Sequence, residues 1–325
     1  MALLAAVLYA FNMPFSKLLL GEVGPAMMAS FLYLGAGVGI GLVYLLGANR
    51  RAAREDKLAR EDTPYVIAMI VLDIIAPILL MLGLQNASAA NASLLNNFEI
   101  VATSVVALVV FKEAVSKRFW AAIALITLAS MLLSFEDVSS FQFSHGSVFV
   151  LAAAICWGFE NNCTRMMSSK SAVQIVMLKG IFSGLGSLIV AAAANERLPE
   201  LRYIAYAMAL GFISYGLSIF LYVKAQKELG AAKTSAYYAV APFIGALLSF
   251  VILKDGLSPT YLIALSVMLI GAAFVVLDTM TVKHRHMHEH TLVHIHSGIE
   301  EQETITHEHC HTHLLNRKSK HTHIH

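Results

Sequence analysis

Three carboxylic acids stand out because each lies within a long apolar run of the sequence: Asp73, Glu99 and Glu160. An acid at the centre of a membrane helix costs about 2.5–3.5 kcal/mol to insert, so such residues are rare and face the interior of a bundle. Two interpretations stay open for each acid. A structural acid is paired with Lys179, which also lies in an apolar run, or is protonated and hydrogen-bonded to a neighbouring Asn or Tyr. A functional acid takes up and releases a proton as its surroundings change.

Histidines are concentrated at the end of the chain, where 13 of the 14 lie between His284 and His325. Most alternate as His-x-His, so neighbouring imidazoles fall on one face of an extended chain. Zinc takes four such ligands, and imidazoles with an ordinary pKa near ~6.5 are mostly neutral at cytoplasmic pH. The predicted metal ligands are His284, His286, His288, His290, His294, His296, His307, His309, Cys310, His311, His313, His321, His323 and His325. Because the segment has low hydrophobicity, we expect it to be disordered without a metal.

Membrane helices are the elements that must position the acids. Of the 325 residues, 58% are apolar and only 14% are charged, and the mean hydropathy is +0.68. A soluble fold of this composition would lack the polar surface to cover itself. Segments with the roughly 20 apolar residues that a span requires number ten, over about 2–20, 25–46, 64–84, 88–111, 118–135, 146–167, 172–194, 202–223, 231–253 and 258–278. Most linkers are short, which predicts a single all-α bundle of antiparallel neighbours.

The second half of the sequence repeats the first. The stretch that opens at Ser88 aligns without a gap on the stretch that opens at Gly230. Both contain a pair of alanines, a serine, an apolar run, and a Lys-acid turn followed by a serine and an aromatic residue. An earlier match pairs Ala5–Lys17 with Ala153–Arg165. Each half therefore has five predicted spans, and an odd number makes the second half enter the membrane from the opposite side, which is an inverted repeat.

The predicted domains are a first five-helix repeat over 1–135, an extracytoplasmic linker over 136–145, a second five-helix repeat over 146–279 and a cytoplasmic His-rich tail over 280–325. Lys and Arg collect on the side that carries both termini, whereas the other side has only Lys17, Arg197, Arg202 and Lys254. By the positive-inside rule the first side is cytoplasmic. We expect a multi-pass protein of the plasma (inner) membrane with both termini in the cytoplasm.

These features resemble the EamA family of the drug/metabolite transporter superfamily over about residues 1–279. The resemblance is carried by the five-plus-five inverted repeat, by the aromatic, Asn and Lys pattern that ends the first span, and by the small-residue run that leads to an apolar helix and a Lys-acid turn. It implies a cavity between the halves, lined by the first four spans of each. Family members commonly have a proline midway along spans four and nine. Pro242 fits, but the first copy has Asn96–Ile100 there, which puts Glu99 where a kink is expected.

Glu99 and Glu160 lie on two helices that the resemblance places at one cavity. This favours the functional interpretation, and we predict that at least one of the two carries a coupling proton. Nearby amide and tyrosine side chains can supply hydrogen bonds and an amphipathic wall to a small polar solute. The predicted substrate cavity consists of Asn12, Asp73, Asn96, Asn97, Glu99, Glu160, Asn161, Tyr215, Tyr237 and Tyr238.

Two functions stay open. The favoured one is an exporter or exchanger of small organic metabolites or drugs that works by alternating access, with the tail as a metal-binding regulatory appendage. The alternative is a transporter of zinc, nickel or cobalt with the tail as its cytoplasmic loading site. Cys156, Glu160 and Cys163 favour the alternative, because their spacing puts them on one helical face as a track of soft ligands.

An enzyme is not indicated, because the sequence has no nucleotide-binding loop, nucleophile elbow or metal-hydrolase spacing. We expect no required cofactor, although zinc or nickel can bind the tail. The expected partners are the lipid bilayer, a small-molecule substrate and divalent metal ions, with no nucleic acid. A homodimer stays open.

Overall fold

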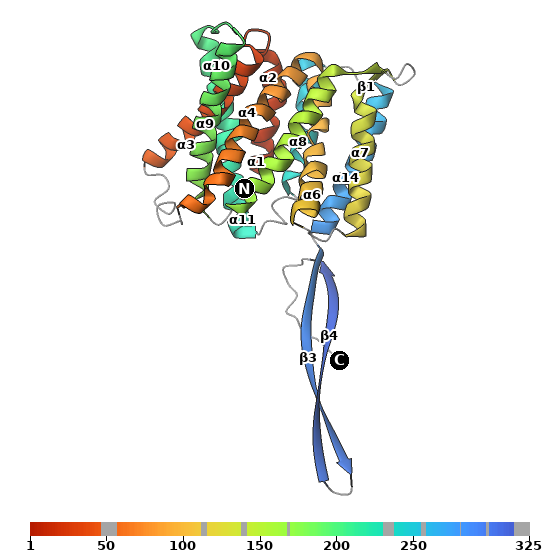
Figure 1. The fold of residues 1–325 in the computed structure, drawn as a ribbon. Helices are drawn as coiled ribbons and strands as arrows, with labels where there is room; N and C mark the ends of the chain where they lie inside the picture. The colour runs from red at the N-terminus through yellow and green to blue at the C-terminus, as the bar shows by residue number, and fades with distance from the viewer. Residues whose placement is uncertain are drawn as a thin grey trace.

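The computed structural model describes residues 1–46, 57–111, 116–137, 142–167, 170–229, 237–254, 258–279, 281–296 and 299–314. These residues form a helical bundle and a separate β-hairpin at the end of the chain (Figure 1). The first half contains α1 (Ala2–Ala10), α2 (Asn12–Leu19), α3 (Pro25–Leu45), the short η2 (Arg60–Asp62), α4 (Thr63–Asn86), α5 (Ala89–Leu95), α6 (Phe98–Phe111) and α7 (Lys117–Ser134).

A short antiparallel pair, β1 (Phe135–Asp137) and β2 (Gln142–Phe143), connects the two halves. The second half contains α8 (His145–Met166), α9 (Ala172–Ala193), α10 (Leu201–Gly211), the π-helical η3 (Phe212–Leu217), α11 (Ser218–Leu229), α13 (Ala241–Leu253) and α14 (Pro259–Thr279). The hairpin consists of β3 (Thr281–His296) and β4 (Ile299–Leu314). The predicted all-α bundle is thus confirmed, with the hairpin as an addition.

Eight segments of the described chain are long and apolar enough to cross a membrane. Several combine consecutive helices, as α1 with α2, α5 with α6, and α10 with η3 do. The two other predicted spans correspond to α8 and α13. α8 is 22 residues long but carries Glu160, Asn161 and Asn162, which lower its apolarity, and the described part of α13 has 13 residues. Ten spans in all therefore stays a prediction.

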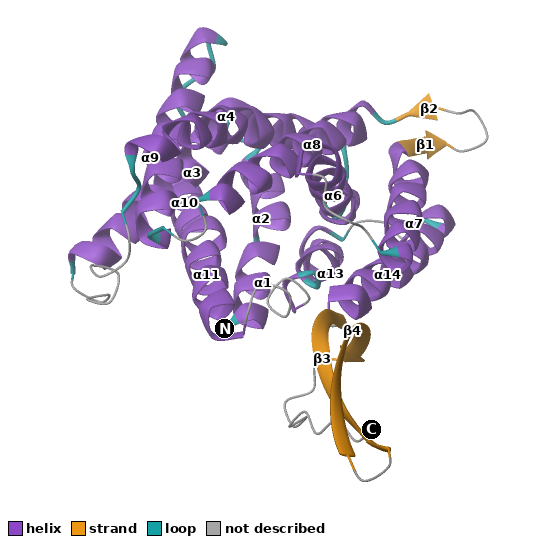
Figure 2. Ribbon diagram, turned by 60° about the horizontal axis from the view of Figure 1, so that its bottom comes forward, coloured by secondary structure: helices purple, strands orange, loops and turns teal. Residues whose placement is uncertain are grey.

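Helix contacts follow the repeat. The counterparts in the two halves are α1 and α2 with α8, α3 with α9, α4 with α10 to α11, α5 and α6 with α13, and α7 with α14. α3 packs on α9 and α7 on α14, so these helices meet their own counterparts (Figures 1 and 2). α4 packs on α8 as α11 packs on α1, and α6 packs on α8 as α13 packs on α1. Exchanging the halves preserves these contacts, as a pseudo-two-fold axis between inverted repeats requires.

Serine residues begin two helices at repeat-related positions. The hydroxyl of Ser116 accepts a hydrogen bond from the Phe119 N–H at 3.1 Å, and that of Ser258 accepts one from the Tyr261 N–H at 3.0 Å. Each serine satisfies a backbone donor that the first helical turn leaves unpaired, which typically stabilises a helix by about 1 kcal/mol. The serine and aromatic residue that recur in the sequence repeat therefore fix the starts of α7 and α14.

Two spans are interrupted at repeat-related positions. The fourth breaks between α5 and α6 at Asn96 and Asn97. In the second half a turn at Ala239 and Val240 precedes α13, and the sequence alignment pairs Ala239 with Asn97, so the two breaks overlap. Pro242 explains the second interruption, since it removes a backbone donor. The first half has the same break without proline, at two adjacent asparagines, a residue type with low helix propensity, and the Asn96 side chain donates to the Tyr9 hydroxyl.

The tail differs from its predicted disorder. β3 and β4 pair antiparallel from Thr281 opposite Leu314 to His296 opposite Ile299, and the hairpin extends away from the bundle (Figure 1). Histidines recur at every second position, which is the period of a strand, and β-branched Thr, Val and Ile are frequent. Low hydrophobicity alone did not reveal this pattern. Residues 315–325, with the predicted ligands His321, His323 and His325, lie outside the described residues.

Close packing of α3 on α9 depends on glycine. A Cβ atom added to Gly180 would lie 2.4 Å from the backbone nitrogen of Gly37, which is far inside van der Waals contact. Such small-residue contacts let membrane helices approach until their backbones touch. Side chains are therefore excluded where these two counterpart helices cross.

Gly180→Ala is expected to destabilise the protein by about 1–3 kcal/mol, because overpacking must push α3 and α9 apart. Gly41→Ala is the control on α3, since its added Cβ would meet only the flexible end of Met177, at 3.4 Å. The melting temperature of each purified variant in detergent checks this. Equal melting temperatures would contradict the packing argument.

Candidate functional site

A buried ion cluster joins three helices at the centre of the bundle. The Lys179 ammonium on α9 lies 3.1 Å from an Asp73 oxygen on α4 and 3.0 Å from a Glu160 oxygen on α8. Both carboxylates are almost fully buried, at 0% and 2% exposed, and Lys179 is 13% exposed. The Tyr33 hydroxyl donates to Asp73 at 2.9 Å, and the Thr164 hydroxyl donates to Glu160. The structural pairing that the sequence left open is therefore observed for these two acids.

Charge in this cluster is unbalanced. Two carboxylates, Asp73 and Glu160, face one ammonium group, so full ionisation leaves one net negative charge away from water. A buried net charge is costly unless another group compensates it. One proton, or one cationic group of a bound solute, would restore neutrality. The arrangement can therefore bind a proton as well as hold helices together.

Glu99 has a different environment. It lies in the first turn of α6, after the break in the fourth span, and is half-buried. Its carboxylate accepts a hydrogen bond from the Asn161 amide at 2.5 Å, and the same amide lies 3.3 Å from the Thr103 hydroxyl. Asn161 directly follows Glu160 on α8, so Glu99 is connected to the ion cluster by one helix. Its recorded partner is a neutral amide and not Lys179.

Five tyrosines form a continuous group beside the ion cluster, here called the tyrosine cluster. Tyr33 contacts Tyr215 with ring centroids 5.3 Å apart, and Tyr215 contacts Tyr9 at 5.8 Å. Tyr9 continues to Tyr238 at 5.9 Å, and Tyr238 to Tyr222 at 4.9 Å. Because the Tyr33 hydroxyl binds Asp73, these rings and the acids form one amphipathic interior.

Amides anchor the tyrosine cluster at two helix interruptions. Asn12, which follows the break between α1 and α2, is fully buried and donates to the Tyr215 hydroxyl at 3.1 Å. Asn96, at the break between α5 and α6, donates to the Tyr9 hydroxyl at 3.3 Å. Tyr215 itself lies in the π-helical η3, a form of helix that frequently marks functional sites. Irregular backbone from three spans therefore meets at these rings.

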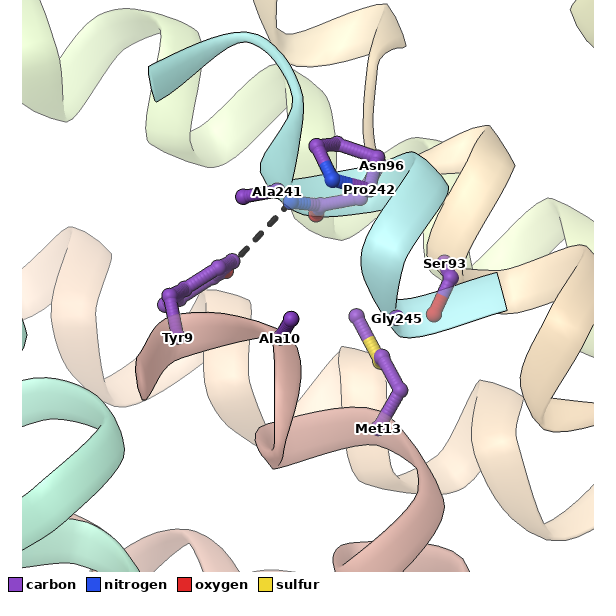
Figure 3. A pocket seen from close by; sticks show the side chains of 8 residues that line it. All are labelled: Tyr9, Ala10, Met13, Ser93, Asn96, Ala241, Pro242 and Gly245. Carbon is purple, nitrogen blue, oxygen red and sulfur yellow. Dashed lines mark hydrogen bonds between the residues drawn. The ribbon is translucent and has the colours of Figure 1, made fainter. Parts of the chain in front are cut away.

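A small cavity lies beside Asn96 (Figure 3). Its volume is about 10 Å³, which is close to the space of one water molecule and far below the roughly 300–1,000 Å³ of small-molecule sites. Its lining comes from spans one, four and nine and consists of Tyr9, Ala10, Met13, Ser93, Asn96, Ala241, Pro242 and Gly245. This cavity is therefore too small to hold an organic solute in this conformation.

A larger hollow, of about 380 Å³, lies elsewhere, between α3 and the α10–η3 segment. Its lining is apolar and includes Val38 and Leu42, which are 41% and 54% exposed on the outside of the bundle. It does not include the predicted polar residues, so it is not the predicted substrate cavity.

Most of the predicted cavity residues lie in the interior. Asn12, Asp73, Asn96, Asn97, Glu160 and Tyr215 are buried, and Glu99, Asn161 and Tyr238 are half-buried. Tyr237 differs, because it is 43% exposed while its neighbour Tyr238 belongs to the tyrosine cluster. Successive helical residues point about 100° apart, so two adjacent tyrosines rarely face the same cavity.

Sequence reasoning missed Tyr9, Tyr33 and Tyr222 as members of this interior, and it treated Lys179 only as a structural partner. A tyrosine in a membrane helix is as often an interfacial anchor as an interior residue, so the residue type alone did not indicate an interior position. The sequence did indicate an interior position for Lys179. A lysine within an apolar run is expected to pair with a carboxylate, and Asp73 and Glu160 lie in apolar runs as well.

Metal ligands were predicted mainly in the tail, whose side chains lie outside what the structure describes. Among the described side chains, no three of His, Cys, Asp and Glu group closely enough to hold a metal ion. Cys156 and Cys163 are half-buried free thiols, and the Glu160 carboxylate between them in sequence pairs with Lys179 and Thr164. The geometry around Glu160 therefore favours a proton or ion-pair role.

The sequence model of the EamA-like transporter family matches residues 1–135 and 144–277. The chain belongs to this family. It is therefore an integral multi-pass membrane transporter and not an enzyme, with a lipid bilayer around it and a small-molecule substrate.

Two uncharacterized transporters are similar to this chain over most of its length. The chain is 26% identical over 285 residues to an uncharacterized transporter of Methanothermobacter thermautotrophicus (strain Delta H), with 82% of each protein covered. It is 22% identical over 247 residues to the uncharacterized transporter YyaM of Bacillus subtilis (strain 168), covering 73% of this chain and 80% of YyaM. One crystal structure of a protein is similar with a TM-score of 0.63 and 16% identity, covering 86% of this chain and 96% of that one. That likeness shows the shared fold alone.

Lys179→Met is expected to destabilise this transporter by about 3–5 kcal/mol, because Asp73 and Glu160 would remain buried without a counter-charge. The control is Lys170→Met, whose ion pair with Asp62 spans 3.8 Å near the surface and contributes at most about 1 kcal/mol. Thermal unfolding in detergent measures both. Adding Asp73→Asn and Glu160→Gln to Lys179→Met should recover part of the loss; no difference between the two lysine variants would contradict the cluster's role in stability.

Proposed function

We propose that this EamA-like transporter is an exporter or exchanger of small organic metabolites or drugs that works by alternating access. The main support is the ion cluster, because its carboxylates and lysine come from both halves and lie beside interrupted helices. In secondary transporters, substrate and coupling-ion sites are typically found near the bilayer midplane, where discontinuous helices of two repeats meet. In this chain the ion cluster joins the two repeats and lies close to the interrupted helices.

Symmetry supports the alternating part of this mechanism. Helix contacts are preserved when the two halves are exchanged, so a second arrangement with the roles of the halves reversed would have similar packing. One arrangement would open the interior to one side of the membrane and the other to the opposite side. The small volume beside Asn96 fits a closed state between them. From the positive-inside rule we propose an inner-membrane location with both termini in the cytoplasm.

The interior chemistry suits a small polar solute. Amide groups at Asn12, Asn96, Asn97 and Asn161 provide donors and acceptors, while the tyrosine cluster provides flat apolar faces with polar tips. Many of these groups already bind one another, as Asn12 binds Tyr215. A solute that enters must therefore replace internal hydrogen bonds with its own, which links solute binding to opening of the bundle.

Proton coupling is proposed at Glu99 and Glu160. Glu160 belongs to a cluster that one proton would neutralise, and Glu99 is joined to it through Asn161. Opening toward water stabilises the ionised carboxylate, whereas closure favours the neutral one. A proton can thus be released on one side of the membrane and taken up on the other as the solute moves.

Glu99→Gln and Glu160→Gln are expected to abolish pH-gradient-driven uptake into proteoliposomes while solute exchange at equal pH persists. Gln keeps the size and hydrogen bonding of Glu but cannot titrate, and Lys179 retains Asp73 as a partner in Glu160→Gln. Counterflow with a panel of amino acids, nucleosides, sugars and organic amines first identifies the solute.

Glu22→Gln serves as the control for this experiment, since Glu22 is exposed in the loop between α2 and α3. Melting temperatures in detergent separate loss of coupling from loss of fold. If both single variants keep wild-type stability and undiminished proton-driven transport, neither carboxylate is the coupling site.

The His-rich tail is proposed to bind zinc or nickel and to regulate transport. The alternative is that it loads metal into a transporter whose cargo is that metal. Both roles require metal binding by the same segment, but they differ in what its removal does.

Deleting residues 280–325 is expected to leave counterflow of the organic solute intact and to abolish any response of that transport to added zinc. The folded bundle of the truncated protein should keep its melting temperature, because the hairpin extends away from it (Figure 1). Zinc uptake by the intact protein that the deletion removes, with no organic solute transported by either, would instead favour the loading role.

A further inference from the structure

The hairpin register aligns histidines from its two strands. His284 lies directly opposite His311, His286 opposite His309, and His288 opposite His307. Alternate residues of a strand share a face, so these three pairs follow one another along one face of the hairpin. The six positions of these pairs are here called the histidine ladder.

This alignment is a property of the register and not of the His-x-His pattern alone. A shift of one residue would place the histidines of β3 and β4 on opposite faces of the hairpin. As paired, every histidine of both strands falls on the ladder face, and the members outside the ladder are His290, His294, His296 and His313. Cys310 is paired with Arg285 and falls on the other face, which separates it from the histidines with which the sequence grouped it.

We propose that the histidine ladder is a binding site for a divalent metal of the zinc class, in which two adjacent pairs supply four imidazoles to one ion. Directly opposite residues in an antiparallel pair have Cβ atoms about 4.5–5.5 Å apart, and alternate residues along a strand are about 7 Å apart. Four positions at such spacings suit the tetrahedral coordination of zinc, with Zn–N distances of about 2.0–2.1 Å. Imidazole ligands favour zinc, copper and nickel over calcium and magnesium.

The ladder makes metal binding and strand pairing interdependent. Each ion takes ligands from both β3 and β4, so the ion stabilises the paired form of the tail relative to separated strands. This inference rests on the proposed metal binding by the tail. It adds which residues bind and that the site spans two strands.

Zinc titration of the full-length protein in detergent micelles, followed by calorimetry at pH 7.2, tests the ladder. The ladder variant combines His284→Ala, His286→Ala and His288→Ala. The matched variant combines His290→Ala, His294→Ala and His296→Ala, which removes as many histidines from the same strand and face. Its cross-strand partners are Ile305, Glu301 and Ile299.

The ladder variant is expected to weaken the tightest zinc site by about tenfold or more, because half the imidazoles of a site are lost, and the matched variant by less than about threefold. Zinc should slow amide hydrogen exchange in both strands of the wild type and of the matched variant, but not of the ladder variant. Cys310→Ser should leave zinc affinity unchanged.

Equal weakening in the two triple variants would overturn the ladder while leaving metal binding by the tail in place. A large loss of affinity in Cys310→Ser would also overturn it. Absence of zinc binding by the wild type would reject both the ladder and the proposed metal-binding tail.

Discussion

The ammonium group of Lys179, held 3.1 Å from Asp73 and 3.0 Å from Glu160, constrains how the two halves of this transporter can move. A charge left alone in a helix bundle costs far more than one that is paired. α4 of the first repeat and α8 and α9 of the second must therefore stay together, or separate only when a proton, water or solute replaces the lost partner. The same contacts that stabilise the closed bundle thus set the chemical condition for opening it.

Helix interruptions provide the places where opening can occur. The breaks at Phe11, at Asn96–Asn97 and at Ala239–Val240 all lie next to the tyrosine cluster. Backbone outside regular helix can change its dihedral angles without unfolding a whole span. The rigid crossing of α3 and α9 at Gly37 and Gly180 offers no such freedom. The structure therefore separates a fixed crossing from helices that can bend around the polar interior.

Sequence alone predicted the helical bundle, the repeat and the interior position of the acids. The position of the acids could be predicted because a carboxylate that faces lipid is costly. It could not choose a partner for each acid, since rotation of one helix against another decides whether Glu99 or Glu160 meets Lys179. The kink expected near Glu99 lacked the proline that usually causes it, so the break at Asn96 had no clear cause in the sequence. Tyr33 had no feature that distinguishes it from an interfacial tyrosine. Strand pairing in the tail depends on the pairing register, which cannot be predicted from amino-acid composition.

The position of Lys179 late in the chain has a consequence for biogenesis. Asp73 enters the membrane with the first repeat, before the helix that carries its counter-charge has been synthesised, and α8, the least apolar of the long helices, brings Glu160 next. Until α9 follows, the membrane must accommodate acids without their base. Although the two repeats are alike in sequence, the first has no base for Asp73, so the ion cluster is complete only when both repeats are in the membrane.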